Sequence, residues 1–424
     1  MRYNTYKFLT SFFAPLVGLW LRYRLWRGKE DKARFGERFG FSKLTRPEGV
    51  LLWIHAASVG EANSVLPLLA QMETRFPEVK ILLTTGTVSS AKLIAARNLK
   101  NVIHQYIPVD TPEAVARFLR RWRPDIGFWV ESELWPNLVI SARTRGCFMV
   151  IINGRMSPRS FDSWQKRGLL MIYQMLQCFE VVFAQSEADA QRFRALGAQD
   201  SRFFGNIKYD ALPLSCEEAV LFALKQQINS RPAWLAASTH ADEELQIAQA
   251  HTILAKTYPN LLTIIAPRHP QRGAEIAIKL AKFGNVALRS RGDKIGADTK
   301  FYIADTLGEL GLFYRLCEIV FMGGSLVERG GQNPIEPIRL RCVIIAGTHT
   351  ENFKDIYTEM ANLGIYAAVR DAHELAAQVH SFMQNSEEII KRQTISKEWL
   401  NSKSGAISRI VNTLAPIFAP VEQS

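Results

Sequence analysis

The chain has 424 residues, of which 47% are hydrophobic and 22% charged, with a formal net charge of +12 at pH 7. This length predicts two folded domains, and the composition excludes a disordered or low-complexity protein. The five cysteines are scattered without a Cys-x-x-Cys pair. They therefore argue against a disulfide framework or a zinc site and favour reduced thiols in a cytosolic protein.

The N-terminal segment, residues 1–46, carries most of the positive charge, with eleven Lys and Arg against three Asp and Glu. Its apolar run, 8–21, is shorter than the roughly 20 residues of a membrane-spanning helix. No small-residue cleavage site follows, which argues against a signal peptide. We predict a helix embedded in the inner leaflet, or a short span extended by Trp20 and Trp26, with the basic cluster against anionic headgroups. The alternative is an ordinary core helix; no nucleic-acid motif is present, so no nucleic-acid partner is expected.

From Val50 onward, short apolar runs alternate with amphipathic stretches. The predicted strands of the first half are 51–56, 81–85, 102–107, 126–131, 148–153 and 181–185. Helical segments such as 61–76, 89–97 and 112–122 separate them, and this alternation is typical of parallel β-α-β units. The rhythm restarts near Pro232, with predicted strands at 234–237, 262–266, 286–289, 301–304, 319–322 and 343–346.

Between the two halves, residues 205–215 have the turn-rich composition of a linker. We therefore predict an α/β protein with two doubly wound domains, 47–212 and 213–424, that face a cleft. In such folds ligands bind beyond the carboxyl ends of the strands. The last amphipathic stretch, 386–418, is predicted to be helical and able to pack back across the domain junction.

The first predicted strand runs into HAASVGE (55–61), which ends in a glutamate at the start of the next helix. The helix dipole favours an ionised carboxylate there, so Glu61 is a candidate general base. A glutamate in the first helical turn can also simply cap the helix. Both interpretations stay open at this point.

The fourth predicted strand ends in ESELWPN (131–137), with two carboxylates one residue apart. In an extended segment the side chains of Glu131 and Glu133 would point to opposite faces. No Asp-x-Asp motif and no ligand-like histidine spacing accompany them, so we predict no essential metal. Capping a helix or pairing with arginines is the structural alternative. Nearby strand ends and the linker add two cations, Arg155 and Lys208, whose alternative interpretation is a solvated surface charge.

In the second half, ASTH (237–240) offers two hydroxyls, Ser238 and Thr239, as a helix cap and a phosphate contact. The next strand ends in PRHP (267–270), where Arg268 and His269 stand between two prolines, a rigid cationic pair suited to a phosphate. A third loop, which includes Gly308, Glu309 and Leu310, leads from a strand toward another helix.

The stretch IVFMGGSLVERGGQNPIEP (319–337) is the most informative one. An apolar strand ends at Gly323, Gly324 and Ser325, whose amides could approach a ligand closely. A helix is then predicted to start at Pro334, where its N-terminus attracts anions. The same segment carries the carboxylate of Glu336. The amides would bind a phosphate and the carboxylate would bind ribose hydroxyls, so the combination suits a nucleotide. The alternative is a connection that binds nothing. The candidate residues of this helix start are Asn333, Pro334, Ile335 and Glu336.

This set of motifs resembles the Kdo transferases of lipopolysaccharide assembly, which are inverting glycosyltransferases of the two-domain GT-B type. The match extends in order over nearly the whole chain. The motifs that carry it are HAASVGE (55–61), TTGT (84–87), ESELWPN (131–137), NGRMS (153–157), GNIKYD (205–210), ASTH (237–240), PRHP (267–270) and GGSLVERGGQNPIEP (323–337).

The resemblance implies transfer of Kdo from CMP-Kdo to a lipid A precursor at the cytoplasmic face of the inner membrane, with no separate cofactor. It implies that Glu61 is the general base and that Glu131 and Lys208 stabilise the transition state. It assigns CMP binding to the second domain, through Arg268 and His269, residues 308–310 and residues 333–336.

Two other functions remain as hypotheses. A nucleotide-sugar epimerase can use the same two-domain fold, but it needs no lipid surface. A non-enzymatic anionic-lipid binder would use the basic N-terminus, but it leaves the pocket-like loops unexplained. Release of CMP that depends on a lipid acceptor would exclude the first, and absence of CMP affinity would favour the second.

Overall fold

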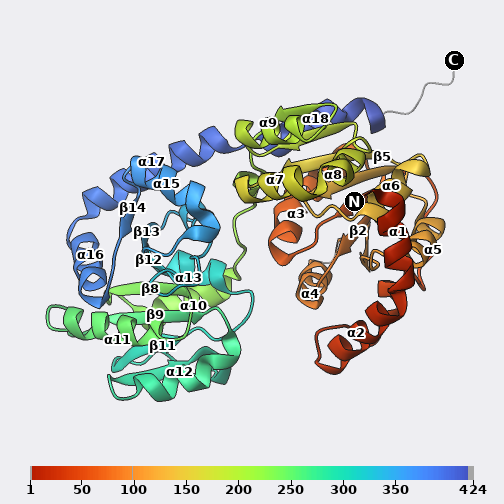
Figure 1. The fold of residues 1–424 in the computed structure, drawn as a ribbon. Helices are drawn as coiled ribbons and strands as arrows, with labels where there is room; N and C mark the ends of the chain where they lie inside the picture. The colour runs from red at the N-terminus through yellow and green to blue at the C-terminus, as the bar shows by residue number, and fades with distance from the viewer. Residues whose placement is uncertain (1, 98, 419–424) are drawn as a thin grey trace. The chain divides into compact units, whose positions relative to one another are not determined.

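The computed structural model describes residues 2–97 and 99–418 and divides into two compact units. The first unit comprises the chain up to Leu212 together with the segment from Lys403 onward, and the second runs from Pro213 to Ser402. The C-terminal segment thus packs with the first unit, whereas the sequence assigned it to the second domain. Figure 1 shows this late helix, in blue, among the helices of the first unit.

The first unit is built on a seven-stranded parallel sheet in the order β3-β2-β1-β4-β5-β6-β7. Its strands are β1 (Leu51–His55), β2 (Lys80–Thr85), β3 (Val102–Tyr106), β4 (Ile126–Val130), β5 (Phe148–Gly154), β6 (Val181–Ala184) and β7 (Ser201–Phe203). Alternate residues of each strand enter two separate cores, one on each face. Trp53, for example, packs on one face and Ile54 on the other.

Helices cover both faces of this sheet. They are α1 (Tyr3–Phe12), α2 (Ala14–Trp26), α3 (Val59–Arg75), α4 (Val88–Ala96), α5 (Pro112–Trp122), α6 (Pro136–Thr144), α7 (Pro158–Ser163), α8 (Leu169–Leu176), α9 (Glu187–Ala195) and α18 (Ala406–Phe418), with the short turns η1 (Phe35–Phe39), η2 (Trp164–Gly168) and η3 (Ile207–Asp210). Helix α18 shares a core with α3, because its apolar face, which includes Ile410 and Leu414, is buried there.

The second unit repeats the architecture with a parallel sheet in the order β10-β11-β9-β8-β12-β13-β14. Its strands are β8 (Ala233–Thr239), β9 (Leu262–Pro267), β10 (Asn285–Leu288), β11 (Thr299–Ile303), β12 (Ile319–Met322), β13 (Val343–Ala346) and β14 (Tyr366–Ala368). The structure confirms every predicted strand, with ends shifted by a residue or two. Two edge strands, β7 and β14, were not predicted, because three residues carry too short a pattern.

The helices of the second unit are α10 (Glu218–Ile228), α11 (Glu243–Leu254), α12 (Gly273–Leu280), α13 (Leu310–Leu316), α14 (Ile335–Arg339), α15 (Lys354–Asn362), α16 (Ala372–Gln384) and α17 (Ser386–Lys403), with the turns η4 (Pro270–Arg272), η5 (Arg289–Arg291) and η6 (Glu351–Phe353). Helices α11, α12 and α16 bury their apolar residues in one core against the sheet. The predicted C-terminal helix is thus two helices, α17 and α18, separated by Gly405 at φ +92°.

The N-terminal apolar run forms two helices, α1 and α2, which break at Phe13 just before Pro15. Neither is a core helix: α1 buries no residue and α2 buries only Leu21, so that alternative was wrong. Hydrogen bonds tie α1 to the first unit, because the Tyr6 hydroxyl donates to Asp110 at 3.0 Å and the Ser11 hydroxyl donates to Glu113 at 2.6 Å. No helix among the described residues is long and apolar enough to cross a membrane.

Candidate active site

The order of the first sheet reverses between β1 and β4, and ligands of doubly wound folds bind beyond the carboxyl ends of strands at such a switch point. Two predicted site residues lie there. Glu61 stands in the first turn of α3, which follows β1, and Glu131 directly follows β4. The topology therefore brings together two carboxylates that are 70 residues apart in sequence.

Glu61 is held in a fixed position by the turn before α3. Its carboxylate accepts a hydrogen bond from the Ala57 amide at 2.8 Å and another from the Ser58 hydroxyl at 2.8 Å. In return, the Ser58 oxygen accepts from the Glu61 amide at 3.2 Å. This is a variant of the capping box in which the glutamate bonds to the Ala57 amide instead of the N-cap amide. The capping interpretation of Glu61 is thus correct as local structure, and it fixes the orientation of the carboxylate.

The pKa of Glu61 rises from its usual 4.5 to about 7. Burial is the largest cause, since only 8% of the residue is exposed, and the negative charges of Glu131 and Glu133 add to it. The two hydrogen bonds of the capping box partly oppose the rise. A carboxylate with this pKa exchanges its proton near neutral pH, as a general base must.

Glu131 forms an ion pair with Lys208, with 2.6 Å between its carboxylate oxygen and the lysine Nζ. The residue has φ +59°, so the chain turns sharply after β4. This corrects the prediction of an extended segment with opposed carboxylates, and it explains why Glu131 and Glu133 both act on the pKa of Glu61. The charge partner of Glu131 is a lysine, whereas the structural alternative expected an arginine.

Lys208 is positioned by two asparagines of the predicted motifs. The Asn153 side chain accepts from the Ile207 amide at 3.0 Å, and the Asn206 side chain accepts from the Lys208 amide at 3.0 Å. Asn153 itself adopts φ +55° at the end of β5. These contacts bring the NGRMS and GNIKYD motifs together beside Glu131.

The other two candidates of the first unit are less constrained. Glu133 is half-buried and accepts from the indole Nε1 of Trp135 at 3.0 Å. Arg155 has an exposed side chain, and its backbone carbonyl accepts from the Ser132 hydroxyl. Glu133 therefore influences Glu61 through its charge, while Arg155 is free to meet a ligand from solvent.

The second sheet reverses between β8 and β12, and its switch point also carries a glutamate, Glu243. Strand β8 continues through Thr239, and α11 begins only at Glu243, with Asp242 as its N-cap. The prediction that Ser238 and Thr239 cap a helix was therefore wrong. Thr239 is buried and its hydroxyl donates to Glu244 at 3.2 Å, whereas Ser238 has a left-handed backbone with φ +58°.

The glycine-rich loop after β12 does not offer its amides to solvent. The amides of Gly324 and Ser325 donate to the Glu243 carboxylate at 2.7 and 3.0 Å, and the Gly323 amide donates to the Ala237 carbonyl at 2.8 Å. This corrects the prediction that these amides could face a phosphate. The glycine at 323 is instead required for packing, because a Cβ there would lie 2.5 Å from the Ser238 carbonyl oxygen.

Several predicted donor residues do gather in one small pocket of about 80 Å³ at the carboxyl ends of β8, β9 and β11. Its lining includes Ser238, Arg268, Gly308 and Leu310. The guanidinium of Arg268 is exposed there and pairs with no carboxylate within 4 Å among the described residues. Its neighbour His269 is also exposed and meets the His240 ring edge-on at 5.9 Å.

Of the residues at 333–336, Glu336 lies within electrostatic reach of Arg268. Burial raises the pKa of Glu336, while a hydrogen bond with Asn333 and the charge of Arg268 oppose the rise. The helix α14 begins at Ile335 with Pro334 as its N-cap, within one residue of the prediction, and spans five residues. In contrast, Glu309 turns toward Arg289, whose guanidinium donates to it twice, at 2.7 and 3.1 Å.

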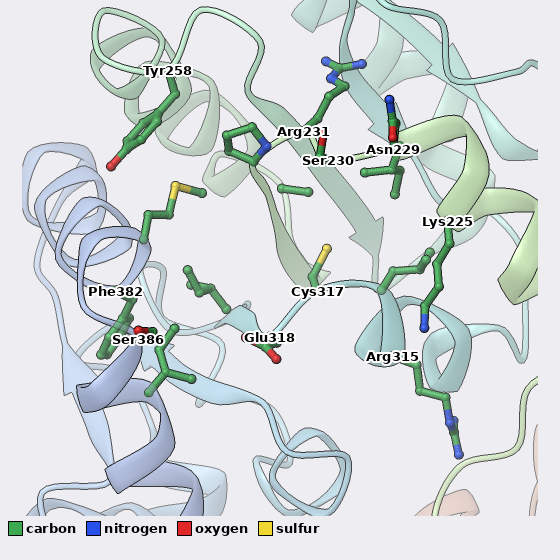
Figure 2. Close-up of a pocket in the computed structure, with 17 residues that line it drawn as sticks. Lys225, Asn229, Ser230, Arg231, Tyr258, Arg315, Cys317, Glu318, Phe382 and Ser386 are labelled. Atoms are coloured by element: carbon green, nitrogen blue, oxygen red, sulfur yellow. The ribbon is translucent and has the colours of Figure 1, made fainter.

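A larger groove of about 720 Å³ lies at the amino ends of the strands of the second sheet, near the first residues of β8 and β12. Figure 2 shows Cys317 and Glu318 in its centre, between Phe382 and Lys225. Its Arg231 donates to the carbonyls of Asn260, Leu261, Gly296 and Thr299, so this guanidinium holds loops together. None of the predicted site residues lines this groove.

Sequence reasoning missed Glu243. A signal was present, because Ser58 to Glu61 and His240 to Glu243 have the same spacing after the first strand of each unit. The repeated spacing predicts a repeated contact: the Glu243 carboxylate accepts from the His240 amide at 2.9 Å, three residues earlier. What the spacing does not report is the three further donors from the loop after β12.

Known proteins resemble this chain over most of its length. Residues 33–211 match the family described as 3-Deoxy-D-manno-octulosonic-acid transferase (kdotransferase). The chain is 33% identical over 419 residues to a 3-deoxy-D-manno-octulosonic acid transferase of Rickettsia bellii, covering 97% of this chain and 99% of that protein. It is 34% identical over 416 residues to a probable mitochondrial 3-deoxy-D-manno-octulosonic acid transferase of Arabidopsis thaliana, covering 96% and 93%.

Among solved structures, the UDP-GlcNAc 2-epimerase of Neisseria meningitidis is similar, with a TM-score of 0.60 over 87% of this chain and 100% of that one. The sequence identity is 13%, so this likeness concerns the fold alone. It confirms the predicted pairing of two Rossmann-like α/β domains.

Proposed function

The chain belongs to the 3-deoxy-D-manno-octulosonic acid (Kdo) transferase family and is a glycosyltransferase, and we propose that it transfers Kdo from CMP-Kdo to a lipid A precursor with inversion and without a metal. The observation that carries this proposal is the buried Glu61, whose pKa of about 7 suits a base. A sugar hydroxyl is a weak nucleophile, and a positioned carboxylate that takes its proton makes the attack feasible.

In the proposed reaction, the acceptor oxygen forms a bond to the anomeric carbon of Kdo while its proton passes to Glu61. The bond from that carbon to the phosphate oxygen breaks, and the electron pair leaves with CMP. Attack and departure occur on opposite faces of the sugar, so the configuration inverts. No oxidant, reductant or further group is needed for this balance.

Glu131 and Lys208 are proposed to stabilise the transition state in the first unit. The anomeric carbon gains oxocarbenium character, which a nearby carboxylate favours, and the carboxylate of Kdo suits an ammonium group. Their ion pair of 2.6 Å supports this assignment, because it holds the two side chains against each other at the end of β4. Because the two groups are already in place, little free energy is spent on reorienting them when charge develops in the transition state.

CMP is proposed to bind the second unit at the pocket that contains Arg268. Its single phosphate gains negative charge as it leaves, and an exposed guanidinium beside His269 can neutralise that charge. Glu336 lies within electrostatic reach of the same arginine and is hydrogen-bonded to Asn333, and both side chains suit the hydroxyls of the nucleoside. Ser238 and the 308–310 turn complete the pocket.

The acceptor is proposed to be presented at an anionic membrane surface, at the cytoplasmic face of the inner membrane. Helices α1 and α2 support this, because they expose large apolar side chains that include Phe8, Phe12, Leu16, Trp20 and Trp26. The basic residues of the segment 1–46 suit phosphate headgroups. Such helices can lie in the interface without crossing it.

The test is incubation of the full chain with CMP-Kdo and a tetra-acylated lipid A precursor in detergent, followed by mass spectrometry of the lipid. The expected result is a lipid whose mass increases by whole Kdo residues, with CMP release that depends on the lipid. Release of CMP in the absence of lipid, or an unmodified lipid, would contradict the proposal. The first of these results would instead favour the epimerase hypothesis.

A further inference from the structure

Glu243 is the point at which the loops of the second switch point meet. It is fully buried and accepts four backbone hydrogen bonds. One carboxylate oxygen accepts from His240 and Gly324 at 2.9 and 2.7 Å. The other accepts from Ser325 and Leu326, each at 3.0 Å. All four donors are amides of the two loops that end β8 and β12.

This arrangement has the form of an anion cradle, since successive backbone amides of a glycine-rich loop converge on two oxygens. In this chain the anion is part of the protein. The packing leaves little freedom, because a Cβ at Gly323 would lie 2.6 Å from the Thr239 Cα, and one at Gly347 would lie 2.1 Å from the Ser325 carbonyl oxygen. Glu243 thus fixes the β12 loop against the β8 turn.

We propose that Glu243 is a positioning residue for donor binding, an internal carboxylate that occupies the amide cradle and fixes the two loops, so that the donor phosphate is bound by the side chain of Arg268 with His269 beside it. This inference rests on the proposed function, because it takes CMP-Kdo as the donor. Ser238, near the end of β8, lines the same pocket as Arg268. His240, in the turn that follows β8, contacts both His269 and Gln332, the latter at 3.3 Å. A shift of this turn and of the end of β8 would therefore move the pocket.

The decisive variant is Glu243→Gln, which keeps the size of the side chain. Its NH2 group would face two of the four backbone donors, so one side of the cradle loses its acceptor. We expect CMP affinity of the full chain, measured by titration calorimetry, to fall by on the order of tenfold or more, because two buried amides lose their partner. The KM for CMP-Kdo should rise by a similar factor, while the KM for the lipid acceptor stays within about twofold.

A second variant, Glu243→Asp, keeps both oxygens and is expected to recover part of the CMP affinity. It carries the test if Glu243→Gln fails to fold. The matched control is Asp125→Asn at the amino edge of the first sheet, where Asp125 accepts from the Leu51 amide at 2.8 Å and binds Arg46. This control is expected to lower the melting temperature and leave CMP affinity unchanged.

The second half of the inference is tested with cytidine, which lacks the phosphate. Arg268→Gln should remove most of the advantage that CMP has over cytidine in the wild-type protein. A folded Glu243→Gln variant with wild-type CMP affinity and donor KM would overturn the positioning role. If Glu243→Gln does not fold, wild-type values for Glu243→Asp would overturn it. If Arg268→Gln keeps the full advantage of CMP, the phosphate assignment is wrong. A wild-type protein that binds no CMP would instead refute the proposed donor itself.

Discussion

The two switch points place a glutamate at comparable positions and use it in different ways. Each glutamate stands in the first turn of the helix after the first strand of its unit, and each contacts the residue three positions earlier. Glu61 accepts one amide and one hydroxyl and lies beside two other carboxylates. The Glu243 carboxylate accepts hydrogen bonds from four backbone amides.

The difference shows how one local motif can serve chemistry or architecture. Burial raises the pKa of Glu243 as well, but four backbone amides that favour its charged form oppose this rise. A carboxylate that is buried beside like charges binds a proton near pH 7. In the roles proposed above, the glutamate of the second sheet fixes loops and the glutamate of the first sheet transfers a proton.

The sharpest way to break this comparison is to substitute the proposed base. Glu61→Gln should reduce the transfer rate by about 10²- to 10⁴-fold, the usual contribution of general base catalysis, and leave CMP affinity unchanged. Rates would be measured by mass spectrometry of the lipid product. The control is Glu73→Gln, in the same helix α3 but at its far end. Near-normal turnover by Glu61→Gln would assign the base elsewhere.

The pH dependence of transfer tests the electrostatic part of the comparison. Glu61 acts as a base only when deprotonated, so the wild-type rate should rise with pH up to about 7 and fall about tenfold per unit below it. Glu131→Gln removes a like charge and should move the acidic limb to lower pH. Lys208→Met leaves the charge of Glu131 unpaired and should move it to higher pH.

Both variants should also lose about 10- to 100-fold of the maximal rate, if they remove transition-state interactions. The measurement is the pH profile of kcat/KM, normalised to its plateau, so that the shift is separate from the loss in rate. Shifts in the same direction for the two variants would contradict the assignment of Glu131 as the charge that raises the pKa of Glu61.

The substitution of Glu243 should lower the stability more than the substitution of Glu61, whereas the transfer rate should depend more on Glu61. Glu243→Gln leaves two buried amides without an acceptor, at about 1–3 kcal/mol each, so the free energy of unfolding should fall by about 2 to 6 kcal/mol. Glu61→Gln can accept from Ala57 and donate to the Ser58 hydroxyl, so its cost should stay near about 1 kcal/mol. Denaturant titrations of both variants provide the comparison, and equal costs would contradict it.

Most of the fold followed from the sequence because parallel strands buried on both faces form continuous apolar runs. The strand ends also indicated Glu61, Glu131 and Arg268 as candidates, since the topology gathers the strand ends of each sheet at one edge. Their roles stay predictions. The three-residue strands carry too little pattern to be recognised. The sequence predicted that the last amphipathic stretch could pack back across the domain junction, yet it assigned this stretch to the second domain, because an amphipathic face does not name its partner.

The glycine-rich loop shows a deeper limit. Its composition predicted that backbone amides approach a ligand, but Gly324 and Ser325 donate to Glu243, which is 81 residues away in the case of Gly324. Composition cannot distinguish a cradle for a ligand from a cradle that the protein fills itself. The backbone of Glu131 was also unpredictable from the sequence. It is left-handed, a conformation that is uncommon for a residue other than glycine and that no sequence pattern indicated here.

The smallest predicted effect concerns Asp210, the last residue of the GNIKYD motif. Its carboxylate accepts from the Ile407 amide at 2.7 Å and from the Gly405 amide, and so caps α18 from another segment. Asp210→Ala should cost about 0.5–2 kcal/mol, the usual value of a helix cap. Because Asp210 ends the turn η3 that contains Lys208, the variant should also lower the transfer rate by a few-fold.

Asp371→Ala is the matched control, since Asp371 caps α16 in the second unit through the amides of His373 and Glu374 at 2.8 and 2.9 Å. It should lower the melting temperature and leave the transfer rate unchanged. If Asp210→Ala lowers the melting temperature without affecting the rate, then α18 only completes the core of the first unit. A loss of rate confined to Asp210→Ala would connect α18 to the position of Lys208, and therefore to the charge that acts on Glu61.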